Sequence, residues 1–236
     1  MIPKIVHKTG KFLSVEKLPN ELKYFNKFNQ NNNKEYKFIY YNDEDCINIV
    51  KNFDPKVFEA YNILIPSAYK ADIFRMVILY LKGGIYSDLP QKFLKPLKTF
   101  IDHSKDLICI QNMEIAFIAA KPKSKIIRYI IDYQVNNVLF RRYGSGYLDI
   151  TGPDACYRAY NIFFKFSQFK QIDMGNHSID NFNISVIGKY TTKVINNKKN
   201  KYIIDKDNKE IIKLYTNNYH NIMYKDKKNY GFYYNR

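Results

Sequence analysis

Residues 68–88 read AYKADIFRMVILYLKGGIYSD and join a helix pattern, a pair of glycines and a strand pattern. Apolar residues recur at helical spacing over 68–82, which predicts the strongest helix of the chain. Gly83-Gly84 is typical of a helix C-cap, and Ile85 to Asp88 continues as a short strand. A long helix that leads directly into a strand favours an α/β fold.

Further strands and helices alternate on both sides of this unit. Strands are predicted at 3–7, 37–41, 107–110 and 115–120, and helices at 18–29, 45–52, 124–139 and 153–166. Residues 201–205 and 210–215 flank a polar turn and predict a C-terminal hairpin. This order predicts an α/β fold with a mixed, mostly parallel central sheet flanked by helices.

The chain has 236 residues, 46% of them hydrophobic, which is enough for one sizeable core. We expect a single domain over 1–236, without internal repeats. No apolar run approaches the roughly 18 residues that span a bilayer, and the start is too interrupted for a signal peptide. The cysteines are odd in number and widely spaced. These features predict a soluble, cytoplasmic protein without a disulfide framework.

A net charge of +16 is compatible with nucleic-acid binding. However, only six of the 38 basic residues are arginines, and the lysines are dispersed through a chain rich in Asn, Ile and Tyr. That composition is typical of AT-rich coding and suits a parasite or a large DNA virus, whose product would act in the host cytoplasm. Nucleic acid is therefore not the expected ligand, and a basic nucleic-acid-binding protein is the third functional hypothesis.

The sequence contains no Walker A loop and no HExxH, GxSxG or GxGxxG motif, which argues against kinases, metalloproteases, serine hydrolases and NAD enzymes. It does place Asp72 and Arg75 three residues apart, so that they share one helix face. An ordinary surface ion pair would have the same spacing. However, both residues interrupt an apolar helix that ends beside the strand carrying Asp88. A carboxylate that accepts from hydroxyls and an arginine that binds phosphate oxygens indicate a nucleotide-sugar pocket.

The motifs in this region resemble a known family. ADIFR at 71–75, followed by LYLKGGIYSD at 79–88, is similar to the signature ADxxRxxxLYxxGGIYxDxD. IPKIVHKT at 2–9 and YNDED at 41–45 look like the ends of its first two strands, and TGP at 151–153 and Tyr219-His220 like later elements. The family comprises DxD-containing sugar transferases, including the fungal initiating mannosyltransferase and, more distantly, the glucosyltransferase domains of large clostridial toxins.

This resemblance implies a GT-A-like domain whose donor-nucleotide half is about 1–122 and whose acceptor-side half is about 123–236. It implies catalytic roles for Asp72, Arg75 and Asp88. The residues expected to bind the donor are Val6, His7, Thr9, Asp72, Arg75, Gly84, Tyr86 and Asp88. His7 at a strand end has an equally ordinary structural interpretation. Asp154 is expected on the acceptor side, although it also suits a helix N-terminus.

The chain departs from the signature at Pro90, where the second Asp of the DxD would stand. Proline has no side-chain oxygen and no backbone N–H. Three hypotheses follow. Asp88 and His220 hold Mn²⁺ or Mg²⁺ with the diphosphate; or Arg75 and Lys225, Lys227 and Lys228 neutralise the leaving group without metal; or the protein is an inactive relative.

The expected function is transfer of a hexose or N-acetylhexosamine from a UDP- or GDP-sugar to a hydroxyl of a glycan or protein. The resemblance implies retention at the anomeric carbon. In that case the leaving phosphate can take the acceptor proton, so a separate general base is not compulsory. The alternative is a catalytically inactive protein that binds a sugar nucleotide or a glycan.

Overall fold

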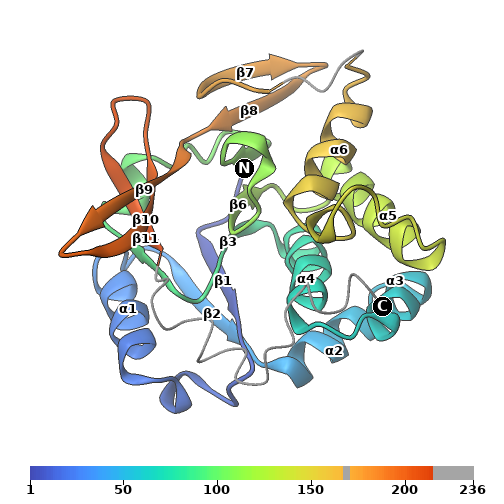
Figure 1. Cartoon of the computed structure of the whole chain (residues 1–236), viewed down its shortest axis with the longest axis horizontal. Helices are drawn as coiled ribbons and strands as arrows, with labels where there is room; N and C mark the ends of the chain where they lie inside the picture. The colour runs from blue at the N-terminus through green and yellow to red at the C-terminus, as the bar shows by residue number, and fades with distance from the viewer. Residues whose placement is uncertain (167–170, 215–236) are drawn as a thin grey trace.

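The computed structural model describes residues 1–166 and 171–214 (Figure 1). Within them a seven-stranded central sheet has the order β2-β1-β3-β6-β5-β8-β7. Its strands are β1 (Ile5–Thr9), β2 (Lys37–Tyr41), β3 (Gly84–Ser87), β5 (Leu107–Cys109), β6 (Phe117–Ala120), β7 (Gly175–Ile179) and β8 (Phe182–Val186). All except β6 and β7 run in the same direction. The predicted mixed, mostly parallel sheet is confirmed.

A second, antiparallel sheet has the order β4-β11-β10-β9. Its strands are β4 (Gln91–Phe93), β9 (Lys189–Ile195), β10 (Lys198–Ile204) and β11 (Glu210–Leu214). The predicted C-terminal hairpin is confirmed as β10 and β11. The sequence did not predict that β4, which lies more than 100 residues earlier, would pair with β11. A three-residue strand carries too little periodicity to be recognised before its partner is known.

The α-helices are α1 (Asn20–Asn31), α2 (Asp43–Lys51), α3 (Pro55–Ile63), α4 (Ser67–Lys82), α5 (Lys125–Leu139) and α6 (Pro153–Phe163). Short 3₁₀ turns are η1 (Val15–Lys17), η2 (Leu97–Thr99), η3 (Gln111–Met113) and η4 (Tyr147–Asp149). Helix α3 was not predicted, although Asp54 caps it and proline occupies its first turn. Among the described helices, none combines the length and apolarity required to cross a membrane.

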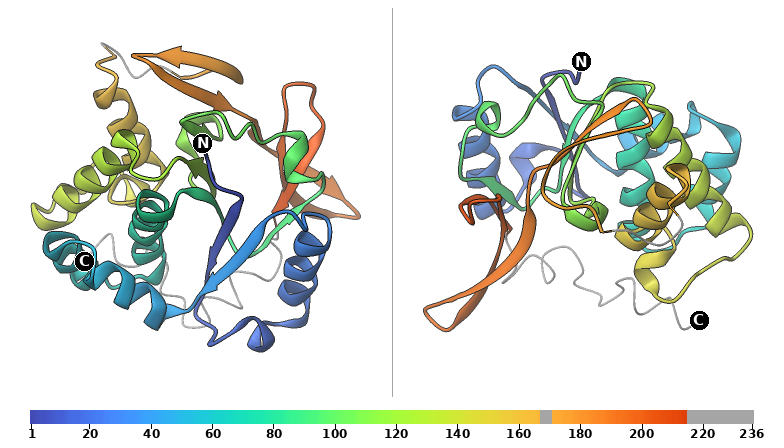
Figure 2. Two further views of the ribbon diagram at one scale, coloured as in Figure 1. Left: turned by 180° about the vertical axis from the view of Figure 1, so that it is seen from behind. Right: turned by 90° about the horizontal axis from the view of Figure 1, so that it is seen from above.

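The two faces of the central sheet are covered differently (Figure 2). Helices α2 to α6 pack on one face, where Tyr86 and Ile118 join the larger hydrophobic cluster. Ile85 and Ala119 point to the other face and pack with residues of the second sheet. This alternation along β3 and β6 follows from the two-residue period of a strand. The fold is therefore a sheet between a helical layer and a smaller sheet.

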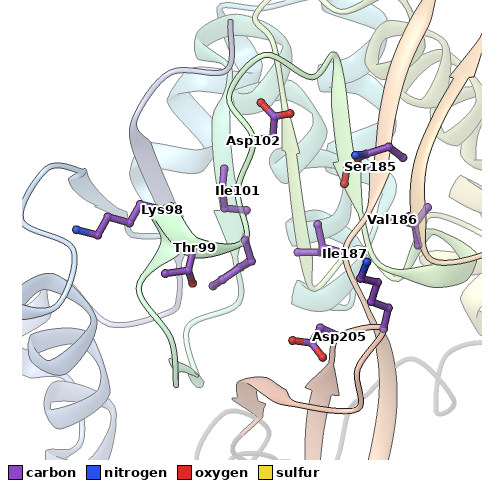
Figure 3. Close-up of a pocket in the computed structure, with 12 residues that line it drawn as sticks. Lys98, Thr99, Ile101, Asp102, Ser185, Val186, Ile187 and Asp205 are labelled. Carbon is purple, nitrogen blue, oxygen red and sulfur yellow. The ribbon is translucent and has the colours of Figure 1, made fainter.

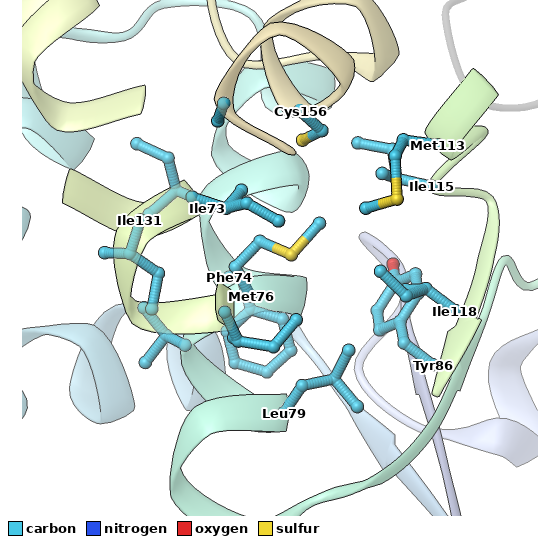
Figure 4. Packing of buried hydrophobic residues seen from close by; sticks show 14 of the residues in the cluster. Ile73, Phe74, Met76, Leu79, Tyr86, Met113, Ile115, Ile118, Ile131 and Cys156 are labelled. Carbon is cyan, nitrogen blue, oxygen red and sulfur yellow. The ribbon is translucent and has the colours of Figure 1, made fainter. Parts of the chain in front are cut away.

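Helix α4 contributes Ile73, Met76 and Leu79 to the larger hydrophobic cluster (Figure 4). Its residues from Asp72 to Leu79 are all buried, including the polar Asp72 and Arg75. A helix that is buried on every side needs few polar positions, so the two that α4 carries in this part require an explanation. They face the end of β3, where the site is built.

The Gly83-Gly84 pair fixes how α4 passes into β3. Gly83 has φ of 63° and its N–H donates to the Leu79 carbonyl at 2.8 Å, which closes the helix. Gly84 has φ of 97°, and a Cβ there would lie 2.7 Å from the carbonyl oxygen of Ile5. Only glycine tolerates both the conformation and the close approach of β1. The predicted C-cap is confirmed.

We predict that Gly84→Ala lowers the free energy of unfolding by about 2 kcal/mol or more, because alanine disfavours positive φ and meets the Ile5 carbonyl. Urea unfolding measures this change. Gly146→Ala is the matched control, since Gly146 has extended backbone and an added Cβ would have no neighbour within 4 Å. Equal stability of the two variants would contradict the role of Gly84.

Candidate functional site

Three of the predicted catalytic residues come together where β3 ends. Nη2 of Arg75 lies 3.0 Å from Oδ1 of Asp72, and its Nη1 lies 3.2 Å from Oδ1 of Asp88. The helical spacing accounts for the first ion pair, and the α4–β3 connection brings in the second. One guanidinium therefore joins two carboxylates that come from different elements.

The Arg75 side chain is 7% exposed and is held on every side that the structure describes. Nη1 also donates to the carbonyl oxygen of Ile115 at 2.7 Å, and Nε donates to that of Ala71 at 3.3 Å. The guanidinium lies 4.6 Å from the centre of the Tyr86 ring. A planar group with this many directional contacts has little freedom to rotate. Its positive charge is permanent at physiological pH.

Asp72 is almost fully buried, and its second oxygen also has a partner. Oδ2 accepts a hydrogen bond from Thr151 Oγ1 at 3.2 Å. Thr151 begins the TGP element at 151–153, so the structure places this element against α4. The sequence motif did not indicate a role for the threonine itself. Its contact with Asp72 depends on a chain separation of 79 residues, which no local pattern reveals.

Asp88 is the most accessible of the three, with 31% of its side chain exposed. Its N–H donates to the Ala116 carbonyl at 2.9 Å, which fixes the end of β3. Burial raises the pKa of the Asp88 carboxyl, and the charges of Arg75 and Lys8 oppose that rise. This carboxylate combines a fixed position with access to a ligand.

A buried lysine, Lys8, contacts the backbone of Asp88. The sequence did not mark it as a site residue. Lys8 is 2% exposed, and its Nζ donates to Ser87 Oγ at 3.1 Å and to the Asp88 carbonyl at 3.0 Å. The ammonium also lies 5.4 Å from the centre of the Phe93 ring. Burial lowers the pKa of Lys8 to about 7, and the negative charge of Asp88 resists that change. The Asp88 turn therefore lies between Arg75, which is always charged, and Lys8, which is about half protonated near pH 7.

The turn at 88–91 places Pro90 in the interior. Leu89 is buried against Leu18 and Leu22, and Pro90 is buried beside it. Gln91 is fully buried; its Oε1 accepts from Ser87 Oγ at 2.8 Å and its Nε2 donates to the Ala116 carbonyl at 3.0 Å. Its amide is thus used to hold the turn. The described residues offer no carboxylate at the position of the second Asp.

Several predicted donor-binding residues support the site from within the fold. Val6 is buried in the core, and Gly84 is packed against β1. His7 is fully buried, and its ring nitrogens lie 3.0 Å from Tyr41 Oη and 2.8 Å from the Gly83 carbonyl. Burial lowers the pKa of His7 to about 4. Its geometry agrees with the structural interpretation, because both nitrogens are already engaged.

Thr9 stands at the end of β1 and borders a cavity of about 210 Å³. Its hydroxyl donates to the Tyr41 carbonyl at 3.0 Å. The cavity is lined by Thr9, Asp43, Cys46, Ile47, Tyr61, Ile65, Ser67, Lys70 and Ala71. Because Ala71 directly precedes Asp72, this cavity adjoins the Asp72 and Arg75 pair along one helix. The YNDED segment contributes one wall of it.

Two further carboxyl groups, Asp154, which was predicted on the acceptor side, and Glu114, interact electrostatically with one another. Asp154 is exposed in the first turn of α6, and burial together with Asp149 raises its pKa. Glu114, which the sequence analysis did not select, has its pKa raised to about 7 by burial and by the charges of Asp154 and Asp88. Glu114 is therefore within electrostatic reach of both sides of the site. It lies in an irregular loop, so no periodic pattern marked it.

The described residues do not supply a set of metal ligands. Among residues 1–166 and 171–214, no three His, Cys, Asp or Glu side chains are placed to hold a metal ion. Asp88 is ion-paired with Arg75, and two cations beside it disfavour a third. His220, Lys225, Lys227 and Lys228 lie outside the described residues.

A second cavity, of about 450 Å³, opens elsewhere (Figure 3). Its walls include Lys98, Asp102, Ser185 and Asp205. None of the residues predicted for the donor or the acceptor lines it. The Asp102 and Asp205 carboxylates already contact Lys105 and Lys95. The larger cavity is thus separate from the chemistry of Arg75, and we do not assign the donor to it.

Comparison with known proteins agrees with this geometry. Residues 19–107 match the family model described as a glycosyltransferase sugar-binding region containing a DXD motif. The resemblance to sugar transferases is confirmed. The matched segment extends from α1 to the first residue of β5 and contains Asp72, Arg75 and Asp88.

Curated relatives match the chain over part of their length. The initiation-specific α-1,6-mannosyltransferase of Candida albicans is 33% identical over 82 residues, which are 34% of this chain and 21% of that protein. A protein of Acanthamoeba polyphaga mimivirus described as an uncharacterized glycosyltransferase is 32% identical over 102 residues, 43% of this chain and 40% of the relative. The Saccharomyces cerevisiae initiation-specific α-1,6-mannosyltransferase is 30% identical over 74 residues, which are 30% of this chain and 15% of that protein. The matches thus span less than half of each relative.

Among solved structures, the PaToxG glycosyltransferase shares the fold. It aligns with a TM-score of 0.50 at 19% identity, over 69% of this chain and 70% of that one. The expected GT-A-like architecture is confirmed by this likeness. At this level of identity the comparison concerns the fold alone.

We predict that the stability of the wild type relative to Lys8→Met, measured as the difference between their free energies of unfolding, rises with pH above about 7. The folded-state pKa of Lys8, about 7, lies below its ordinary value of 10.5, so the unfolded chain binds more protons between these values. The greatest slope from one such group is about 1.4 kcal/mol per pH unit.

Urea unfolding at pH 7, 8 and 9 measures this slope. Lys4→Met is the control, because Lys4 is exposed just before the same strand. Parallel curves for Lys8→Met and the wild type would show that Lys8 does not have the lowered pKa.

Proposed function

We propose that the protein is a glycosyltransferase that moves a hexose or N-acetylhexosamine from a nucleoside diphosphate sugar to a hydroxyl group. The observation that carries the proposal is the buried Arg75 guanidinium between Asp72 and Asp88, within the segment that matches the sugar-binding region. An isolated structural ion pair would not require a second carboxylate that remains about a third exposed. The arrangement suits a ligand that has both hydroxyls and phosphates.

In this proposal Asp72 accepts hydrogen bonds from sugar hydroxyls, and Arg75 donates to oxygens of the diphosphate. Both groups are held in advance by Thr151 and by the carbonyl of Ile115. Preorganised charges stabilise a transition state well because they do not have to reorient during the reaction. Asp88, at the accessible end of the cluster, accepts a hydrogen bond from a hydroxyl group of the donor.

The donor nucleotide occupies the cavity bordered by Thr9 and Ala71. That cavity lies at the carboxyl end of β1, where ligands of open α/β sheets bind. It adjoins Asp72, so the base and the sugar would lie on successive parts of the α4 surface. Tyr61 and the aliphatic side chains of the wall give the base an apolar surface.

The leaving nucleoside diphosphate requires positive charge, and two cations lie beside Asp88. Arg75 supplies a permanent charge, and Lys8 adds an ammonium below the turn. We propose that these two side chains neutralise the leaving group. Metal binding by Asp88 and His220, with Mn²⁺ or Mg²⁺, is the alternative.

Acceptor binding is assigned to the side of Asp154 and Glu114. For a retaining transfer, the phosphate that leaves can take the proton of the attacking hydroxyl on the same face of the sugar. Glu114, with its pKa raised to about 7, lies between the charges of Asp88 and Asp154. It is suited to accept a hydrogen bond from the acceptor and to exchange a proton near neutral pH.

A sugar-nucleotide or glycan binder without transferase activity is the second candidate. The observation that favours it is Pro90, which is buried and leaves Asp88 as the only carboxylate of the motif. Such a protein would retain donor binding but would not hydrolyse or transfer the sugar. Activity measurements therefore separate the two candidates.

We predict that Asp72→Asn reduces hydrolysis or transfer of the donor sugar by about 100-fold or more, since the amide keeps the shape of the side chain but loses the charge that Arg75 and the sugar require. Initial rates with UDP- and GDP-sugars measure the loss. Asp132→Asn is the control, because Asp132 pairs with Arg128 on α5, apart from the site. Near-wild-type rates in Asp72→Asn would refute the site assignment.

We also predict that EDTA leaves the rate of donor hydrolysis within about twofold of the untreated value, because Arg75 and Lys8 supply the charge that a metal would provide. The measurement compares rates in EDTA with rates after addition of Mn²⁺ or Mg²⁺. Loss of activity in EDTA and its recovery with Mn²⁺ would support the alternative based on Asp88 and His220.

A further inference from the structure

The cavity beside Thr9 has two charged groups on otherwise largely apolar walls. Asp43 comes from the first turn of α2, and Lys70 comes from the first turns of α4. Tyr61 and Ile65 also line the cavity. The Lys70 ammonium lies 5.3 Å from the centre of the Tyr61 ring, which gives it a preferred position. A flat ligand in this cavity would meet an anion, a cation and an aromatic side chain.

The Asp43 carboxylate is available to a ligand. Within the described residues it makes no hydrogen bond or ion pair, whereas its neighbour Asp45 accepts from the Asn42 N–H at 3.0 Å as part of the helix cap. Asp43 senses the charges of Lys70 and Lys11 at longer range. The capping hydrogen bonds of the YNDED segment are thus made by Asn42 and Asp45, and the Asp43 carboxylate takes no part in them.

Guanine and uracil present different hydrogen-bonding groups to a carboxylate and a lysine such as Asp43 and Lys70. Guanine presents two adjacent donors, N1–H and the N2 amino group, which one carboxylate accepts together. Its O6 and N7 accept from a lysine. Uracil presents a single N3–H between two carbonyl oxygens, and these oxygens would face the carboxylate and repel it. A carboxylate in the wall therefore favours guanine over uracil.

We propose that the donor of this protein is a guanosine diphosphate sugar, and that Asp43 determines this specificity by accepting from N1–H and the N2 amino group of guanine while Lys70 donates to its oxygen. The inference rests on the proposed function, because it assigns the base of the proposed donor. It goes further by selecting between the two nucleotide classes and by naming the residue that selects.

The test measures dissociation constants by calorimetry for GDP, UDP and inosine diphosphate, which is GDP without the N2 amino group. For the wild type we expect GDP to bind about tenfold or more tightly than UDP, and about fivefold or more tightly than inosine diphosphate. In Asp43→Asn, GDP affinity falls about tenfold and the difference between GDP and inosine diphosphate shrinks to about twofold or less.

Glu44→Gln is the matched control. It removes one negative charge from the same helical turn, but Glu44 is exposed and does not line the cavity. We expect it to retain the wild-type order of affinities. Thermal unfolding of each variant shows whether it is folded, and the comparison of GDP with inosine diphosphate in the wild type requires no variant.

The possible outcomes separate the inference from the proposed function. Binding of UDP as tightly as GDP, or equal binding of GDP and inosine diphosphate, overturns the role of Asp43 and leaves a nucleotide-dependent transferase intact. Equal loss of GDP affinity in Asp43→Asn and Glu44→Gln would show that only overall charge matters and would also overturn it. If neither GDP nor UDP binds, the proposed function itself fails.

Discussion

A permanently charged guanidinium in the interior is the constraint on which this site depends. Arg75 is too buried to be solvated, so its charge has to be satisfied by protein oxygens. Asp72, Asp88 and the Ile115 carbonyl provide them. Each comes from a different part of the chain. The position of Arg75 therefore requires that α4, the end of β3 and the loop before β6 meet at one point.

The second buried cation gives the altered DxD motif a physical interpretation. Lys8 donates hydrogen bonds to Ser87 Oγ and to the Asp88 carbonyl. Its amino group therefore lies against the backbone where the turn at 88–91 begins. In the proposed function, Arg75 and Lys8 take the place of a divalent ion beside Asp88, and a second carboxylate there would change the balance of charge. Pro90 instead packs inside and leaves the turn to be held by hydrogen bonds. The absence of the second Asp at position 90 is thus consistent with the presence of the buried Lys8 beside the same turn.

The sequence could predict those parts of the site that are local. The helix at 68–82, the glycine pair and the three-residue spacing of Asp72 and Arg75 all depend on neighbouring residues, and the structure agrees with each. Lys8 and Thr151 could not be predicted, because their partners lie 79 or 80 residues away. The pairing of β4 with β11 in the second sheet escaped prediction for the same reason. His7 belonged to a recognisable motif, but only the fold shows that both its nitrogens serve the interior.

In the proposed function, helix α4 also determines the distance between the two parts of the donor. Ala71 borders the cavity beside Thr9, and the next residue, Asp72, belongs to the charged cluster. Adjacent residues on one rigid helix cannot move apart, so a ligand that fills the cavity is held at a fixed distance from Arg75. A base in the cavity and a sugar at Asp72 would place the diphosphate between them, beside the guanidinium. Rigid placement of this kind converts binding energy at a remote base into orientation at the reacting bond.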